Sequence, residues 1–165
     1  MLSDEVDEHI VFDGAEHQSV LRHAELAGRS FVVSSFSKTY HCTGWKVGYC
    51  IAPRALSAEL RKVHQYLTFC TFTPAQFAFA DILENDPQHY LDLPAFYQAK
   101  RDRLRALMAG SNFRLRPVAR ADFLVADYSS LGDHTHLAVR DWLDKEGSGA
   151  ASPPAAAYQT SATAA

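Results

Sequence analysis

Residues 32–48 read VVSSFSKTYHCTGWKVG and place one lysine, Lys38, between an apolar β-type run and a turn that contains Gly44. Six hydroxyl side chains lie within five positions of Lys38, and a second cation, Lys46, follows eight positions later. A lone lysine after a strand is usually a solvated loop residue, because lysine is rarely buried. The hydroxyls and the second cation favour another interpretation, in which the segment holds a phosphorylated ligand while Lys38 forms a Schiff base with its aldehyde.

The composition is that of a globular chain. Its 165 residues are 47% hydrophobic, with seven Tyr and ten Phe, which is enough for a sizeable core. The net charge is −3, and no run of Lys and Arg is longer than two, so we expect no nucleic-acid partner. No apolar stretch approaches the roughly 18 residues of a membrane helix, and the first residues lack the pattern of a signal peptide. The three unpatterned cysteines, Cys42, Cys50 and Cys70, indicate reduced thiols in a cytoplasmic protein.

The pattern of apolar residues predicts an α/β architecture. Strands over residues 30–35 and 47–52 would place Lys38 beyond the carboxyl end of a strand, where α/β sheets bind ligands. Helices are predicted over residues 17–27, 53–67, 74–85 and 94–110, with a short one from Asp86, and further strands over residues 112–116 and 121–128.

The predicted helices differ in how much of each we expect to be buried. Apolar residues recur on one face of residues 53–67, which predicts a stripe packed in the core. The helix over residues 74–85 is expected to be mostly buried through its apolar residues Phe77, Phe79, Ala80 and Leu83. Lys100, Arg101, Arg103 and Arg105 are interpreted as the solvated face of an amphipathic helix that Gly110 ends, and not as a binding site.

The segment SFSKTYHCTGWKVGY, residues 35–49, resembles the cofactor-lysine segment of class I aminotransferases that use pyridoxal phosphate, in particular the methionine, kynurenine and glutamine transaminase branch. The family pattern is Ser-x-x-Lys with a basic residue eight positions on, matched here by Ser35, Lys38 and Lys46. SDEVDEHIVFDG, residues 3–14, resembles the Asp-x-x-Tyr segment of that branch, and residues 62–83 resemble its following helices. The resemblance covers about residues 3 to 145.

The resemblance implies a role for each matched residue. Lys38 would form the Schiff base with pyridoxal 5'-phosphate and shuttle a proton, and Ser35 and Lys46 would hold the phosphate. Asp4 would pair with the pyridinium nitrogen, although an isolated acid of this kind is usually a surface residue or a helix cap. Asp7 stands where the family has a tyrosine that donates to the ring oxygen. Because an ionised carboxylate cannot donate, we expect altered cofactor binding.

The resemblance also implies the fold. We expect a partial fold type I transferase, α/β in class, with an incomplete large-domain sheet over residues 1–92 and an interdomain helix with part of the small α+β domain over residues 93–146. A last helix is predicted over residues 136–146, and His134 and His136 are interpreted as loop histidines and not metal ligands. Residues 147–165, rich in Ala, Ser, Gly and Pro, predict a flexible tail. Residues 117–122, PVARAD, stand where relatives often carry a glycine-rich turn.

Two functions remain open from the sequence. The first is transfer of an amino group from an amino acid, methionine-like or aromatic, to a 2-oxo acid by a homodimer of the family type. The second is a catalytically inactive fragment of that family that acts as a non-catalytic or dimerising module, because no residues match the family's phosphate-cradling turn, stacking aromatic, ring-oxygen Asn or substrate-carboxylate Arg. A nucleotide-binding phosphate loop is not expected, because the chain contains no G-x-x-x-x-G-K-[S/T].

Overall fold

The structure is a computed structural model that describes residues 1–131. The described residues divide into two compact units, one made of residues 1–107 with 117–124, the other of residues 108–116 with 125–131. The predicted helix over residues 136–146, the two histidines beside it and the predicted tail lie outside the described residues. The domain boundaries after residues 92 and 146 stay predictions.

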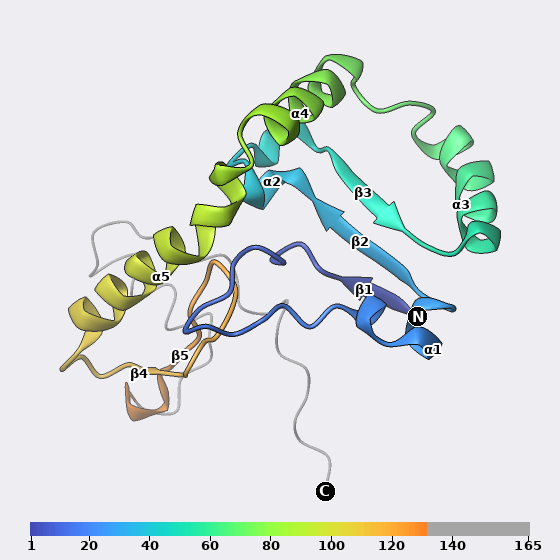
Figure 1. Cartoon of the computed structure of the whole chain (residues 1–165). Coiled ribbons are helices and arrows are strands. Elements are labelled where there is room, and N and C mark those ends of the chain that lie inside the picture. Colours follow the sequence, from blue (N-terminus) through green and yellow to red (C-terminus); the bar gives the residue numbers. More distant parts are fainter. Residues whose placement is uncertain (132–165) are drawn as a thin grey trace, which may run out of the picture. The chain divides into compact units, whose positions relative to one another are not determined.

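A three-stranded sheet forms the centre of the first unit (Figure 1). Its strands are β1 (Leu2–Asp4), β2 (Phe31–Ser35) and β3 (Gly48–Ile51), in that order across the sheet. β2 runs parallel to β1 and antiparallel to β3. The strands predicted on both sides of Lys38 are therefore confirmed, each with slightly narrower bounds.

The hydrophobic core lies where α4 (Thr73–Asn85) covers the short helix α2 (Phe36–Thr39), as Figure 1 shows. Val47, Ala75 and Phe79 are buried there. The rings of Phe36 and Phe79 stack with their centroids 4.4 Å apart, an arrangement that adds to the gain from burial. This core therefore fixes the segment that carries Lys38, since α2 itself packs against it.

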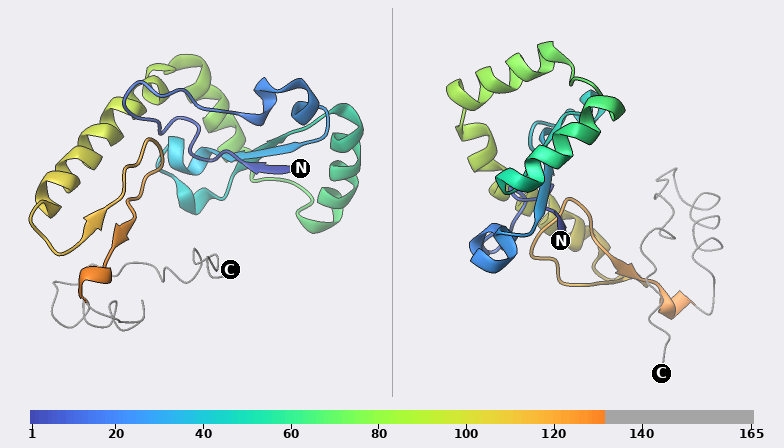
Figure 2. Two further views of the ribbon diagram at one scale, coloured as in Figure 1. Left: turned by 90° about the horizontal axis from the view of Figure 1, so that it is seen from below. Right: turned by 90° about the vertical axis from the view of Figure 1, so that its right-hand side faces the viewer.

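The apolar stripe of α3 (Arg54–Leu67) is not buried by the residues that the structure describes, so the prediction of a packed core face is wrong for this part of the chain. Leu60, Val63 and Leu67 are 36%, 55% and 80% exposed. Figure 2 shows α3 at the end of the unit opposite α5, where no second described layer covers it. The apolar spacing predicted the helix correctly, but spacing alone does not show that a neighbour is present.

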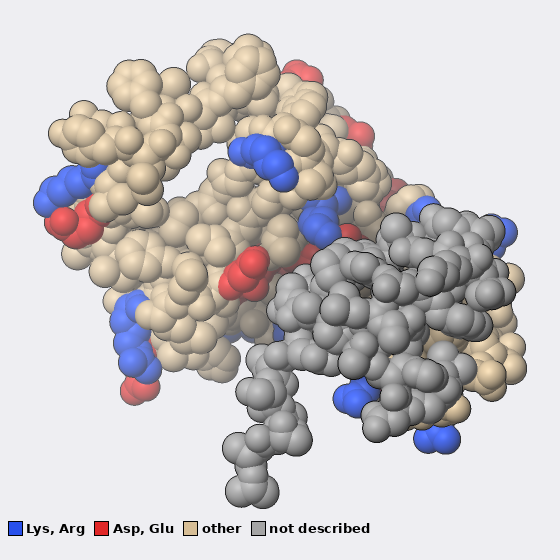
Figure 3. All heavy atoms as spheres, turned by 180° about the vertical axis from the view of Figure 1, so that it is seen from behind, with Lys and Arg blue, Asp and Glu red and all other residues tan. Residues whose placement is uncertain are grey.

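On α4 the expectation of general burial fails in the same way. Phe79 is buried, whereas Phe77 is 74% and Leu83 is 44% exposed. The face of α4 that contains Ala75 and Phe79 packs on α2, and the other faces of α4 are not part of this core. Among the described residues visible in Figure 3, Lys, Arg, Asp and Glu occur in small separate groups between residues of other types.

A single long helix, α5 (Gln88–Met108), replaces the two helices predicted before and after Pro94. Proline removes one backbone hydrogen bond, but Leu93 beside it is buried, and this packing holds the helix through the position. The helix ends at Met108, and Gly110 follows with a φ of +84°, which confirms the predicted end.

Arg101 is the exception to the solvated basic face predicted for α5, since it is only 7% exposed. Its guanidinium donates to both carboxylate oxygens of Asp13, at 2.6 and 2.8 Å, and to the carbonyl of Val118 at 3.0 Å. It also lies over the ring of Phe12, 4.7 Å from the centroid. Arg101 therefore ties α5 to the two segments that Asp13 and Val118 belong to.

The helix predicted over residues 17–27 is instead two short elements, the 3-10 turn η1 (Val20–Arg22) and α1 (Ala24–Ala27). His23 between them is extended, with φ −113° and ψ 108°, which interrupts the helix. Another 3-10 turn, η2 (Thr43–Trp45), precedes β3.

The second unit contains a short antiparallel pair, β4 (Arg114–Leu115) and β5 (Ala126–Asp127), followed by the turn η3 (Ser129–Leu131). Two strands are therefore confirmed in this region, but each has only two residues. Among residues 1–131, none of the helices combines the length and the apolar character needed to cross a membrane.

Candidate functional site

Asp4 and Lys38 lie at the same edge of the sheet. Asp4 is the last residue of β1, and Lys38 lies in α2, which begins directly after β2. Because β1 and β2 are parallel, with Asp4 opposite Val33, their carboxyl ends face the same way. The structure thus brings these two predicted site residues to one edge, the edge where α/β sheets bind ligands.

The amine of Lys38 forms an ion pair with the carboxylate of Asp122. Burial alone would lower the pKa of Lys38, but the hydrogen bond and negative charge of Asp122, aided by Asp7, outweigh it and raise the pKa. The charge of Tyr97 of α5 acts on the pKa of Lys38 in the same direction. Lys38 is therefore held as an ammonium in this arrangement.

Asp122 reaches Lys38 because residues 119–121 run beside residues 10–12. The amide of Phe12 donates to the carbonyl of Ala119 at 2.9 Å, and the amide of Ala121 donates to the carbonyl of Ile10 at 3.1 Å. Ala121 has a φ of +94°, a conformation that side-chain-bearing residues rarely adopt. Asp122 was not among the predicted site residues. The available signal was the segment 117–122, which stands where relatives often carry a glycine-rich turn.

Asp7 adds a second carboxylate beside Lys38. Its Oδ1 is buried and has no hydrogen-bond partner among the described residues. Burial raises the pKa of Asp7, and the charges of Asp122 and Asp4 raise it further, against the opposing effect of Lys38 and Arg120. Near the lysine the site is thus rich in carboxylates and lacks the hydroxyl donor that a tyrosine at position 7 would supply.

Ser35 lies at the start of α2, and Lys46 directly precedes Val47, to which Ser35 is hydrogen-bonded. Ser35 Oγ caps α2 by accepting from the amide of Ser37 at 3.1 Å, and it donates to the carbonyl of Val47 at 3.1 Å. Lys46, next to Val47, is exposed. In this turn Lys46 has a positive φ of 55°, whereas the φ of Gly44 is not positive. A Cβ at residue 48 would lie 2.5 Å from a carbonyl of β2, so glycine lets the two strands approach.

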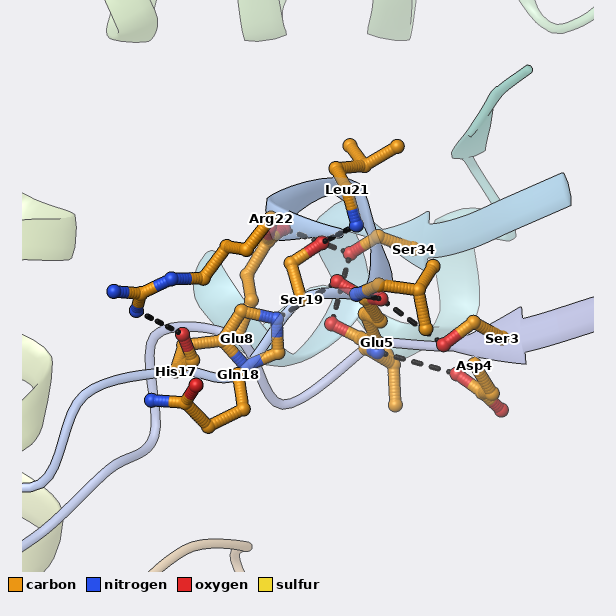
Figure 4. A network of polar contacts seen from close by, with 12 residues as sticks. Ser3, Asp4, Glu5, Glu8, His17, Gln18, Ser19, Leu21, Arg22 and Ser34 are labelled. Atoms are coloured by element: carbon orange, nitrogen blue, oxygen red, sulfur yellow. Dashed lines mark hydrogen bonds and ion pairs between the residues drawn. The ribbon is translucent and has the colours of Figure 1, made fainter. Parts of the chain in front are cut away.

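A polar network anchors residues 5–20 to the sheet beside this site (Figure 4). The carboxylate of Glu5 accepts from Ser3 Oγ and from the amide of Val20, both at 3.0 Å, and lies 2.8 Å from His17 Nε2. Burial alone would raise the pKa of Glu5, but these hydrogen bonds, with one from Ser19, lower it to about 2.

The same network continues through Glu8. The hydroxyls of Ser34, at 2.8 Å, and of Tyr49 both donate to Glu8. Burial and the bond to Glu8 raise the pKa of Tyr49 to about 12. This network was not predicted, because the run SDEVDE shows no periodic pattern that would place its carboxylates.

Comparison with known proteins identifies relatives of one kind. The family model of aminotransferase class I and II matches residues 1–151. A methionine aminotransferase from Escherichia coli is 51% identical over 153 residues, which cover 93% of this chain and 40% of the relative. A kynurenine–oxoglutarate transaminase from Dictyostelium discoideum is 38% identical over 160 residues, which cover 86% of this chain and 36% of the relative.

Solved structures give the same result. The structure of a methionine aminotransferase from Escherichia coli matches with a TM-score of 0.84 and 52% identity, over 88% of this chain and 38% of that protein. An N-succinyldiaminopimelate aminotransferase from Mycobacterium tuberculosis matches with a TM-score of 0.82 and 33% identity, over the same two shares. The chain thus spans about two fifths of the length of these relatives, and its α/β fold is part of the fold type I transferase fold. From the family model and these relatives together, the chain belongs to the aminotransferase class I and II family.

Proposed function

We propose that the chain supplies the cofactor-lysine part of an aminotransferase that uses pyridoxal 5'-phosphate, with Lys38 attached to the cofactor through a Schiff base. The observation that carries this proposal is the position of Lys38 and Asp4 at the carboxyl ends of two adjacent parallel strands. An amine and a carboxylate at one sheet edge suit a ligand with an aldehyde and a basic ring nitrogen.

The residues present fit this cofactor. Lys46 is an exposed cation close in the chain to the hydroxyl of Ser35, and the two would hold the phosphate. Asp4 uses Oδ1 to accept from the amide of Val6 at 3.2 Å, and its second oxygen would stabilise the charge of a protonated ring nitrogen. When bound, the cofactor supplies an aldehyde and an electron-withdrawing ring.

Lys38 would also move the proton in the reaction. Once its amine is free, Nζ would take the proton from the Cα of the substrate, as a general base. Its position in α2, fixed by the stacked Phe36 and Phe79, would keep Nζ near the reacting carbon.

The substrates that we propose are an amino acid, methionine-like or aromatic, and a 2-oxo acid. This part of the proposal is supported by relatives that are named as methionine aminotransferase and kynurenine–oxoglutarate transaminase. Assembly as a homodimer and residence in the cytoplasm are proposed on the same likeness.

A second candidate is a non-catalytic member of the family that acts, if at all, as a dimerising module. The observation that favours it is the ion pair of Lys38 with Asp122, because a paired ammonium does not condense with an aldehyde. Asp7 in place of a hydroxyl donor favours it as well.

The two candidate functions are distinguished by which lysine pyridoxal phosphate modifies. The chain is incubated with pyridoxal phosphate, reduced with borohydride, digested and analysed by peptide mass spectrometry. We expect the adduct on Lys38 in preference to Lys62, an exposed lysine paired with Glu59 at 2.7 Å. Lys38→Arg should remove the preferred adduct, and the matched Lys62→Arg should leave it unchanged. Equal yields on all lysines would favour the non-catalytic candidate.

A further inference from the structure

The ion pair at Lys38 is built by the fold and is not a chance surface contact. Asp122 follows a stretch that is held on one side by the backbone bonds to residues 10–12 and on the other by Arg101, which donates to the carbonyl of Val118 at 3.0 Å. The side chain of Asp122 is 23% exposed and that of Lys38 is 34% exposed, so both are largely withdrawn from water.

The charged and titratable groups around Lys38 come from three segments. Asp122 contacts the amine directly, from residues 117–124, while Asp7 in the loop after β1 and Tyr97 in α5 act on it through their charges. Asp4 and Arg120 act on Asp7 with opposite signs. Among these groups the carboxylates dominate, so the surroundings favour a positive charge on Lys38.

Condensation with an aldehyde needs the opposite state of the amine. The lone pair of Nζ attacks the carbonyl carbon, so the ammonium must first lose a proton to water. A carboxylate that accepts a hydrogen bond from the ammonium opposes this loss.

We propose that Asp122 is a brake on Lys38, a fixed carboxylate that keeps the amine protonated and so slows its reaction with any aldehyde. The negative charge of Asp7 acts on the amine of Lys38 in the same direction as that of Asp122. The consequence for cofactor loading rests on the proposed function, whereas the effect on the amine itself does not.

The test uses formaldehyde and cyanoborohydride, which methylate free amines without any cofactor. The free amine of lysine adds to formaldehyde, one water leaves, and hydride with a proton from solvent converts the imine to the methylated amine. Rates at Lys38 and Lys62 are measured in the full chain by peptide mass spectrometry at pH 8. Asp122→Asn should raise the ratio of the Lys38 rate to the Lys62 rate about two- to fivefold. The matched Asp92→Asn, on the exposed side of α5, should leave the ratio unchanged.

Two further measurements test the effect of Asp122, one on the unaltered chain and one on Asp7→Asn. In the unaltered chain, Lys38 should be methylated more slowly than Lys62 at pH 8, and its rate should rise at higher pH than that of Lys62. Asp7→Asn should have a smaller effect in the same direction as Asp122→Asn. An unchanged ratio in a folded Asp122→Asn variant, or equal pH curves for the two lysines in the unaltered chain, would overturn the brake.

Failure of the proposed function and failure of the brake give different results. If Asp122→Asn speeds methylation of Lys38 but pyridoxal phosphate gives no selective adduct in either protein, the brake stands and the cofactor assignment falls. If Lys38 takes pyridoxal phosphate selectively and Asp122→Asn changes neither rate, the brake alone is wrong.

Discussion

Glu5 offers a direct test of how the polar network holds the segment that ends β1. Replacing Glu5 with glutamine keeps the size of the side chain but removes its negative charge. The carboxylate that carries this charge is hydrogen-bonded to Ser3 Oγ, to the amide of Val20 and to the ring of His17. The pKa of Glu5 is lowered from 4.5 to about 2, and each pKa unit is worth about 1.36 kcal/mol. Ionised Glu5 therefore stabilises the folded chain by about 3 kcal/mol.

The pH dependence follows from the direction of this shift. Because the folded pKa lies below the unfolded value, the stabilisation is complete above about pH 4.5 and is lost as the pH falls towards about 2. We expect Glu5→Gln to lower the free energy of unfolding by about 3 kcal/mol at pH 7, and the difference from the unaltered chain to shrink below pH 4.5.

Urea unfolding followed by circular dichroism at pH 7, 5, 4 and 3 measures this difference. Glu84→Gln, an exposed position on α4, is the matched control and should differ little from the unaltered chain at each pH. A Glu5→Gln difference that is equally large at pH 3 and pH 7, or below about 1 kcal/mol at pH 7, would show that ionised Glu5 does not stabilise the folded chain as described.

Three substitutions test the packing around the site by urea unfolding. Gly48→Ala should cost about 1 to 3 kcal/mol, because the new Cβ would lie 2.5 Å from a strand carbonyl, whereas Gly44→Ala meets open space and should cost little. Phe79→Ala, at a buried ring, should cost about 3 to 5 kcal/mol, and Phe77→Ala, at a ring that is 74% exposed, much less. Ala121→Gly should stabilise the chain by about 1 kcal/mol, since its φ of +94° suits glycine, and a loss of stability would contradict the assigned backbone strain.

The part of the fold around Lys38 was predictable because its signals are local. The run before the lysine alternates as a strand with one buried face, and Val32 and Ser34 are the buried residues. Ser35, Lys38 and Lys46 lie within a dozen residues of one another, in the segment 35–49 whose resemblance to the family's cofactor-lysine segment indicated the family. The parallel pairing that brings Asp4 to the same edge was not readable from spacing, and only the resemblance implied it.

The remainder of the site depends on contacts between distant positions. Asp122 lies 84 residues from Lys38, and Asp13 lies 88 residues from Arg101. No local pattern marks either pair, because the hydrophobic period of a helix or strand carries no information about which charged residues meet across the fold. The basic run on α5 was therefore interpreted as solvated, although Arg101 turns inward to Asp13.

Burial was the other property that local pattern misjudged. The stripe on α3 has the spacing of a packed face, yet Val63 and Leu67 are exposed among the described residues. Periodicity predicts which face of a helix would be covered, and tertiary context decides whether anything covers it. The continuity of α5 through Pro94 is a further case in which tertiary packing overrides a local signal.

One ligand would meet both Lys38 and Asp4. This is tested by the share of pyridoxal phosphate that borohydride fixes on Lys38 in the unaltered chain and in Asp4→Asn. We predict that Lys38 takes the largest share in the unaltered chain and that Asp4→Asn reduces it severalfold, because the amide cannot stabilise a protonated ring nitrogen as a carboxylate does. Asp92→Asn should leave the share unchanged. A Lys38 share that equals that of Lys62, or one that Asp4→Asn does not alter, would contradict the claim.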